Sequence, residues 1–160
     1  MKKALDTLQR IQIGVGAVML TIFLLAVVIQ MGSRYLGLVA TWTEDVSMYS
    51  FIWAAFMGAG AMVHEKKHFA FTSISDSIKN PKAKAALEIV IALVMLTFSV
   101  LMLVYGIQIT KQFWNYKWTS IPSFNRGPVW MCVPICGGTS AIYLLGQLAD
   151  SIKIIAKGEK

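Results

Sequence analysis

The sequence is poor in charge, which excludes most water-soluble folds. Of its 160 residues, 14% are charged and 56% are hydrophobic, whereas an ordinary soluble domain carries about 25% charged residues. Charge is missing altogether from four long stretches, residues 11–33, 46–63, 89–110 and 127–149. A helix of roughly 20 apolar residues crosses a bilayer core about 30 Å thick. The composition therefore predicts an integral membrane protein.

The motifs of soluble enzymes are also missing. The chain has no Cys-x-x-Cys pair, no glycine-rich nucleotide-binding pattern and no Gly-x-Ser-x-Gly elbow. Its two cysteines, Cys132 and Cys136, lie four residues apart in the last apolar stretch, and this helical spacing holds them poorly for a disulfide. We interpret them as small packing residues. We expect no catalytic residue, cofactor or metal in this chain, and we expect that it is not an enzyme.

The uncharged stretches predict an all-α integral membrane protein, with residues 1–160 forming a single domain. The four transmembrane helices are expected at approximately 11–33, 44–63, 87–111 and 127–149. The first is longer than the roughly 7 to 15 apolar residues of a signal peptide, so we interpret it as a retained span. Lys and Arg number 11 in the termini and central loop and 4 in the other two loops. Because positive residues stay on the cytoplasmic side, both termini are expected to be cytoplasmic.

The central loop, between the second and third spans, is amphipathic. Phe71, Ile74 and Ile78 recur at helical spacing with polar residues between them. This pattern predicts a short helix lying on the cytoplasmic interface. Asn80 and Pro81 follow in the order of an N-cap and a first helical residue, so they predict the start of the next helix.

The second and last spans carry further local signals. Thr41 and Glu44 have the spacing of a capping box, and Glu44 and Asp45 are acids in a first helical turn, so a helix start is predicted there. Small residues around Gly58 predict close packing of the second span against neighbouring helices. Pro134 predicts a kink in the last span. The tryptophans near the span ends are interpreted as an interfacial belt: Trp42, Trp114, Trp118 and Trp130.

No Asp, Glu, Lys, Arg or His lies in the four uncharged stretches. Intramembrane charges usually mark a substrate or ion path, so their lack argues against a small proton-coupled exporter. A sodium site made of hydroxyls and carbonyls stays open, because the spans contain hydroxyl side chains at Thr97, Ser99, Thr139 and Ser140. Four helices without an inverted repeat are nevertheless poorly suited to alternating access. An accessory membrane subunit is the better interpretation.

His64 and His68 lie four residues apart beside Glu65, a spacing that suits a metal or a haem iron. Biaxial haem ligation normally takes histidines from two helices, so we interpret these three residues as part of the cytoplasmic interface. A haem- or quinone-associated membrane anchor of an oxidoreductase is the alternative, and a self-associating scaffold is a third possibility. We expect no nucleic-acid binding, because the basic residues are dispersed along short flanks beside the spans.

Several motifs, taken in order, resemble the small membrane subunit (Q subunit) of tripartite ATP-independent periplasmic (TRAP) transporters. The run Thr41–Ser47 opens the second span and is followed by Gly58–Gly60 and His64–Phe69. The last span contributes Gly127-Pro128-Val129-Trp130, with Pro134 and Gly137. The resemblance covers essentially the whole chain. One departure is Met48, where family members often carry an arginine.

The resemblance implies a non-catalytic subunit of a sodium-coupled importer in the bacterial inner membrane. In such a system a periplasmic substrate-binding protein captures an organic acid, of the sialic acid or C4-dicarboxylate class, and a large membrane subunit moves it inward. Taken as a whole, the sequence most resembles the sialic-acid branch of the TRAP family. The small subunit is expected to scaffold the large subunit within the lipid bilayer and to help dock the binding protein. The residues expected at these partner interfaces are Trp42, Glu44, Asp45, Gly58, Lys111, Lys117, Arg126, Pro128 and Trp130.

Overall fold

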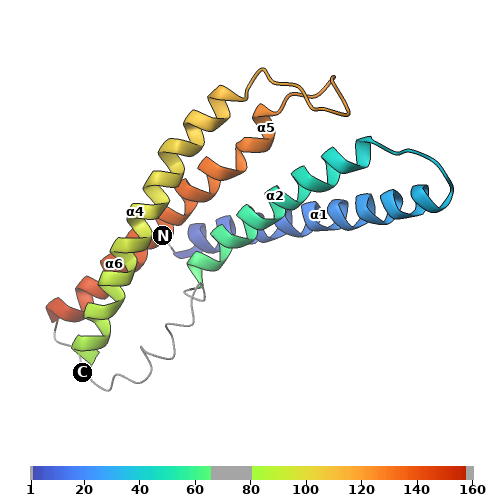
Figure 1. Cartoon of the computed structure of the whole chain (residues 1–160). Coiled ribbons are helices and arrows are strands. Elements are labelled where there is room, and N and C mark those ends of the chain that lie inside the picture. The colour runs from blue at the N-terminus through green and yellow to red at the C-terminus, as the bar shows by residue number, and fades with distance from the viewer. Residues whose placement is uncertain (1, 66–80, 158–160) are drawn as a thin grey trace.

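The computed structural model describes residues 2–65 and 81–157, and these residues are mostly helical (Figure 1). The helices are α1 (Lys2–Tyr35), α2 (Trp42–His64), α4 (Pro81–Gln112), α5 (Gly127–Trp130) and α6 (Cys132–Lys157). Four stretches are long and apolar enough to cross a membrane: Lys3–Tyr35, Trp42–His64, Ala86–Gln112 and Gly127–Ile152. Each overlaps one of the predicted spans. The prediction of an all-α protein with four membrane-spanning helices is confirmed.

The helices pair into two antiparallel hairpins. In the first, α1 packs on α2, and the rings of Phe23 and Phe51 lie 5.1 Å apart between them. In the second, α4 packs on α6 so closely that a Cβ atom at Gly137 would lie 2.7 Å from the amide nitrogen of Leu103. Glycine therefore sets the distance between α4 and α6. Below, the termini side is the end of the bundle with His64 and Pro81, and the loop side is the opposite end.

The two hairpins meet through α2 and α6 and diverge toward the loop side (Figure 1). A small apolar core lies where they meet, formed by Val63, Ala92, Tyr143 and Leu144. Next to it is a polar group that we name the amide cluster, formed by Gln9, Gln12, Thr139, Tyr143 and Gln147. The Gln12 amide donates to Thr139 Oγ1 at 2.9 Å and accepts from the Tyr143 hydroxyl at 2.8 Å. Gln147 Nε2 donates to the Val63 carbonyl at 2.7 Å. Polar and apolar contacts thus hold the hairpins together at this level.

The last span is interrupted, as its proline predicts. Helix α5 ends at Trp130 and α6 begins at Cys132. Pro134 lacks the amide hydrogen that would bond the carbonyl of Trp130, four residues earlier, and its ring crowds that carbonyl. Cys132 and Cys136 are buried and free in α6, which confirms their interpretation as packing residues.

Two expectations about helix starts have different outcomes. Helix α4 begins at Pro81, as predicted. Helix α2 begins at Trp42, with Glu44 and Asp45 in its first turn, so that predicted start is also confirmed. The capping box itself is wrong, because the Thr41 side chain makes no capping bond and its backbone is helical. A backbone bond from the Glu44 amide to the Thr41 carbonyl takes its place. The predicted interfacial helix, and His68 within that loop, lie outside the described residues.

Candidate interaction surface

The first turn of α2 carries one buried and one exposed acid. Asp45 is 5% exposed, and its Oδ2 atom accepts a 2.7 Å hydrogen bond from the backbone amide of Ser120. Glu44 is exposed. Asp45, one of the residues expected at a partner interface, thus bonds to a loop of its own chain 75 residues away. Asp45 instead joins the first hairpin to the connection between α4 and α5.

This connection, residues 113–126, is named the strap. It folds back on itself through an isolated antiparallel bridge between Lys117 and Asn125. The Arg126 amide donates to the Tyr116 carbonyl at 2.7 Å, and Lys117 Nζ donates to Asn125 Oδ1 at 2.6 Å. The Arg126 guanidinium donates to Thr119 Oγ1 at 2.6 Å. These bonds give the strap a defined shape without a regular strand or helix.

Aromatic rings fix the strap to the helices beneath it. The ring of Trp118 lies 4.7 Å from the ring of Tyr49 on α2, and its indole nitrogen donates to the Asn125 carbonyl at 3.0 Å. Phe113, at the start of the strap, lies 5.7 Å from the ring of Trp130 on α5. Tyr49 is buried, so Trp118 packs inside the chain rather than facing lipid on all sides. In Figure 1 the strap reaches from α4 and α5 toward the start of α2.

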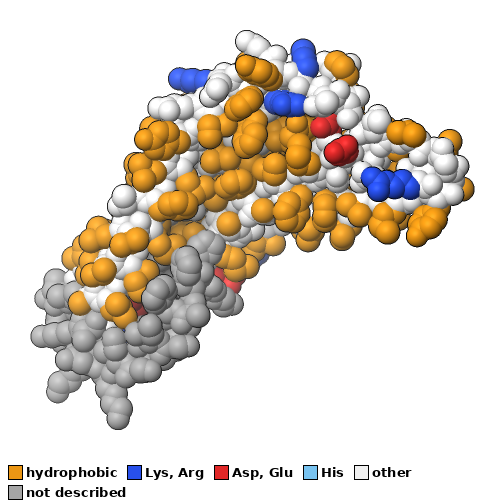
Figure 2. Space-filling model, in the orientation of Figure 1, with side chains coloured by type: hydrophobic (Ala, Val, Ile, Leu, Met, Phe, Trp, Pro, Cys, Tyr) orange, Lys and Arg blue, Asp and Glu red, His pale blue; other side chains and the backbone are white. Residues whose placement is uncertain are grey.

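Several of the expected interface residues are exposed on this side of the molecule. Trp42 is 43% exposed at the start of α2. Lys111, Lys117 and Pro128 are also exposed. Figure 2 shows basic side chains spaced along the loop side with acidic side chains among them. The surface is therefore mixed in charge, with exposed aromatic residues between the charges.

Two buried donors on α5 and its N-cap have no hydrogen-bond partner among the described residues. They are the Nε atom of Arg126 and the indole nitrogen of Trp130. Both residues are half-buried and stand one helical turn apart. Buried donors without partners are uncommon in folded proteins, so these two N–H groups are candidates to donate hydrogen bonds to water or to another molecule.

The structure corrects the prediction for Gly58. A Cβ atom at this position would meet no atom within 4 Å, so Gly58 does not pack tightly against helices of its own chain. The close approach is made two residues later, where a Cβ atom at Gly60 would lie 2.9 Å from the Gln12 amide nitrogen. Gly58 leaves open space on α2 instead.

On the termini side, His64 and Glu65 bond to α1. His64 Nε2 lies 3.2 Å from Asp6 Oδ1, and the imidazole meets the Tyr143 ring edge-on at 5.0 Å. Glu65 Oε1 accepts a 3.0 Å hydrogen bond from Gln9. Within residues 2–65 and 81–157, no three His, Cys, Asp or Glu side chains gather where they could hold a metal ion. The contact with Tyr143 places His64 at the joint between the hairpins, whereas Glu65 bonds within the first hairpin.

The chain was compared with known protein families and with curated proteins. Residues 15–154 match the family described as "Tripartite ATP-independent periplasmic transporters, DctQ component". The chain belongs to the DctQ family. A Haemophilus influenzae protein provisionally named a TRAP transporter small permease protein is 28% identical over 117 residues, which cover 73% of this chain and 71% of that protein.

As a member of the DctQ family, the chain is a small membrane subunit of a TRAP transporter. The matched range begins within α1 and ends within α6, so it covers α2 and α4 completely and most of α1 and α6. Membership also favours transport over the alternative of an oxidoreductase anchor. The TRAP assignment made from the motif order is thus confirmed.

Residues that hold this DctQ subunit together were missed by the sequence analysis. They include Gln9, Gln12, Ser120 and Gln147, none of which a sequence motif singles out. The one available signal was the occurrence of amides next to long apolar runs, where polar side chains commonly bond between helices. Which helix each amide faces follows from tertiary packing alone.

Proposed function

We propose that this chain is a non-catalytic scaffold of a sodium-coupled importer for an organic acid of the sialic acid or C4-dicarboxylate class. In this proposal it supports the large membrane subunit and presents the strap to the periplasmic substrate-binding protein. Both termini are cytoplasmic, so the loop side faces the periplasm. The proposal extends the family assignment to a direction, a coupling ion, a substrate class and a docking role.

The observation that carries the docking role is the bond between Asp45 and Ser120. This bond holds the strap against the first turn of α2. The ring contact between Tyr49 and Trp118 attaches the strap to α2 at a second point. A loop held in one conformation loses little conformational entropy when a partner binds, which favours recognition. Within the described residues, the membrane-spanning segments contain no group of charged side chains that could act on a substrate. The chain is therefore better suited to binding a partner than to catalysis.

The charged side chains on the loop side support the proposal that a protein partner binds there. The strap and the helix ends beside it display Lys111 and Lys117, while Glu44 is the exposed acid nearby. Complementary charges at the rim of an interface raise the association rate and fix the register of the partners. The proposed docking is therefore expected to weaken as the salt concentration rises.

Reconstituted transport tests this proposal. The tagged chain is purified with its large subunit, placed in liposomes with a sodium gradient, and supplied with the binding protein and radiolabelled sialic acid or succinate. The Lys111→Glu variant is expected to raise the binding-protein concentration needed for half-maximal uptake about fivefold, because reversing an exposed charge costs about 1 kcal/mol. The matched control is Lys3→Glu, an exposed lysine on the termini side.

Three results would contradict parts of the proposal separately. Uptake that ignores the sodium gradient would refute the coupling, and uptake of neither acid would refute the substrate class. Equal behaviour of Lys111→Glu and the Lys3→Glu control would refute docking at this end of α4. Failure to recover a large membrane subunit with the tagged chain would refute the scaffold role.

A further inference from the structure

The joint on the termini side is the larger of the two places where the hairpins touch. Here α2 packs directly on α6, since a Cβ atom at Gly60 would lie 3.4 Å from Cys136 Sγ. The amide cluster and the apolar core add hydrogen bonds and buried side chains at the same end of the bundle. Contacts gathered at one end have a short lever arm against rotation. They therefore fix where the hairpins cross better than they fix the angle between them.

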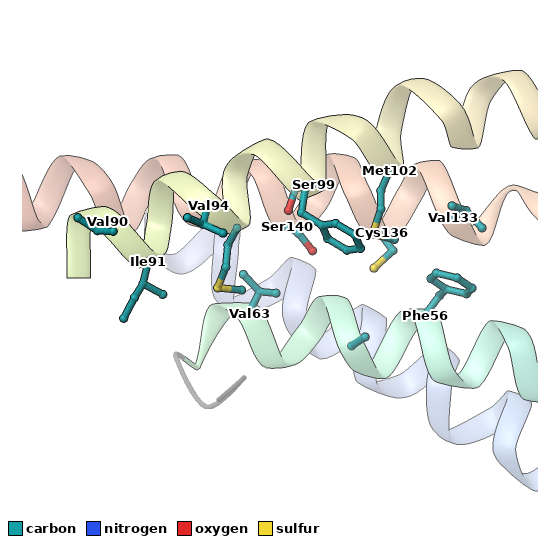
Figure 3. A pocket seen from close by; sticks show the side chains of 13 residues that line it. Phe56, Val63, Val90, Ile91, Val94, Ser99, Met102, Val133, Cys136 and Ser140 are labelled. Atoms are coloured by element: carbon teal, nitrogen blue, oxygen red, sulfur yellow. The ribbon is translucent and has the colours of Figure 1, made fainter. Parts of the chain in front are cut away.

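Beside this joint, α2 and α4 are separated by a groove of about 830 Å³ (Figure 3). Phe56, Ala59 and Val63 form its α2 wall, and the α4 wall runs from Val90 to Met102. The α2 wall carries apolar side chains alone, so its side chains make no directional bond to α4 at this level. Contacts across the groove within this chain therefore leave the angle between the hairpins unset.

On the loop side, the strap belongs to the second hairpin and is firmly built into it. A Cβ atom at Gly127 would lie 2.6 Å from the Trp114 ring, so the start of the strap packs directly on the start of α5. The bridge between Lys117 and Asn125 joins the two arms of the strap. A strap held in this way moves with the second hairpin and transmits force to it.

The strap grips the first hairpin through two contacts that lie one turn of α2 apart. Asp45 Oδ2 accepts the hydrogen bond from the Ser120 amide at 2.7 Å, and the Tyr49 ring lies 4.7 Å from the Trp118 ring. The hydrogen bond is directional, and both Asp45 and Tyr49 are buried. Asp45 stands about 22 Å along α2 from Gly60, at 1.5 Å per residue. The two contacts therefore act on a long lever arm and resist rotation of one hairpin against the other.

We propose that the strap is a tether that sets the angle between the two hairpins, with the joint on the termini side as the pivot. The angle in turn sets the distance between the two halves of the loop-side surface. Trp42 and Glu44 belong to the first half, and Lys111 and Lys117 belong to the second. This inference rests on packing within the chain alone. It does not depend on the proposed substrate, coupling ion or docking role, so its test can fail while theirs succeed.

Double electron–electron resonance on the full chain in lipid nanodiscs measures the angle. In a background with both cysteines replaced by alanine, spin labels are placed at the exposed Met48 on α2 and Gln108 on α4, named the loop-side pair. The variant Asp45→Ala/Trp118→Ala, named the untethered variant, lacks both attachments of the strap. It is expected to broaden the distance distribution of the loop-side pair about twofold, because the hairpins then sample a range of angles. A rotation of about 15° about Gly60, about 18 Å away, moves Met48 by about 5 Å.

Two controls separate loss of the tether from general loosening of the bundle. The matched variant Glu44→Ala/Tyr116→Ala removes exposed side chains from the same two elements and should leave the loop-side pair unchanged. Labels at Met62 and Val90, which are exposed on the termini side, form the pivot pair. The distance distribution of the pivot pair should stay the same in every variant, because the joint is intact.

The result for the loop-side pair decides the proposal. An unchanged distribution in the untethered variant would overturn it, since other contacts would then set the angle. Equal broadening of the pivot pair, or of the loop-side pair in the matched variant, would also overturn it. If the untethered variant is not recovered as folded chain, Trp118→Ala is measured in its place. Broadening of the loop-side pair alone supports the proposal there too, and an unchanged distribution overturns it.

Discussion

Replacing Asp45 by alanine tests whether one side chain holds the strap in place. Asp45 Oδ2 is 2.7 Å from the Ser120 amide nitrogen, and a hydrogen bond to a charged group contributes about 1.5–3 kcal/mol. The alanine variant leaves that amide without its acceptor, so the free energy of opening the strap should fall by about 2 kcal/mol. At 1.4 kcal/mol per factor of ten, the open population rises about 30-fold.

Hydrogen exchange at the Ser120 amide measures this opening, because exchange follows the local opening equilibrium. In Asp45→Ala the Ser120 amide should exchange about 30-fold faster than in the wild type. Asp45→Asn keeps an acceptor oxygen without the charge and should give a smaller increase. Glu44→Ala is the matched control, since Glu44 is an exposed neighbour and its loss should leave exchange unchanged. Equal exchange in wild type and Asp45→Ala would refute the assigned role of the aspartate.

Three further experiments test the interior of the bundle. Gln12→Leu removes two interhelical hydrogen bonds and should lower the free energy of unfolding in sodium dodecyl sulfate by about 1–2 kcal/mol. The control Gln108→Leu, on the exposed face of α4, should change this free energy little. Similar losses in both variants would count against the amide cluster. Gly137→Leu should abolish recovery of a monodisperse chain in size-exclusion chromatography, because a Cβ atom at position 137 would lie 2.7 Å from the backbone nitrogen of Leu103. The control Gly58→Leu should still yield folded chain in the same assay. Cys132 is fully buried and should react with a maleimide only after denaturation, and rapid labelling of the native chain would contradict its position.

The spans were predictable because a membrane imposes a simple requirement on sequence. Long stretches without charge must be present, and α1, α2 and α4 each contain one. The helix start at Pro81 and the interruption near Pro134 were predictable because proline restricts the backbone locally. The capping box at Thr41 failed because backbone bonds of the preceding turn already satisfy the first amides, a fact that spacing does not reveal.

Which residues pack against which helix was much less predictable than the helices themselves. Gly58 and Gly60 stand in the same run of small residues, yet a side chain at one would meet open space and at the other would meet the Gln12 amide. Asp45 and Glu44 are adjacent acids, and one is buried while the other is exposed. A rotation of about 100° per residue separates neighbours on a helix, and which direction faces a partner is set by helices far away in sequence.

The amide cluster has a consequence for how the chain is made. Gln12 emerges from the ribosome early, and its partners Thr139 and Tyr143 emerge more than a hundred residues later. During synthesis the first hairpin is therefore complete before the Gln12 amide can bond to its partners on α6, and an unpaired polar group is costly in the hydrocarbon. The bundle can close only after the last span has been inserted.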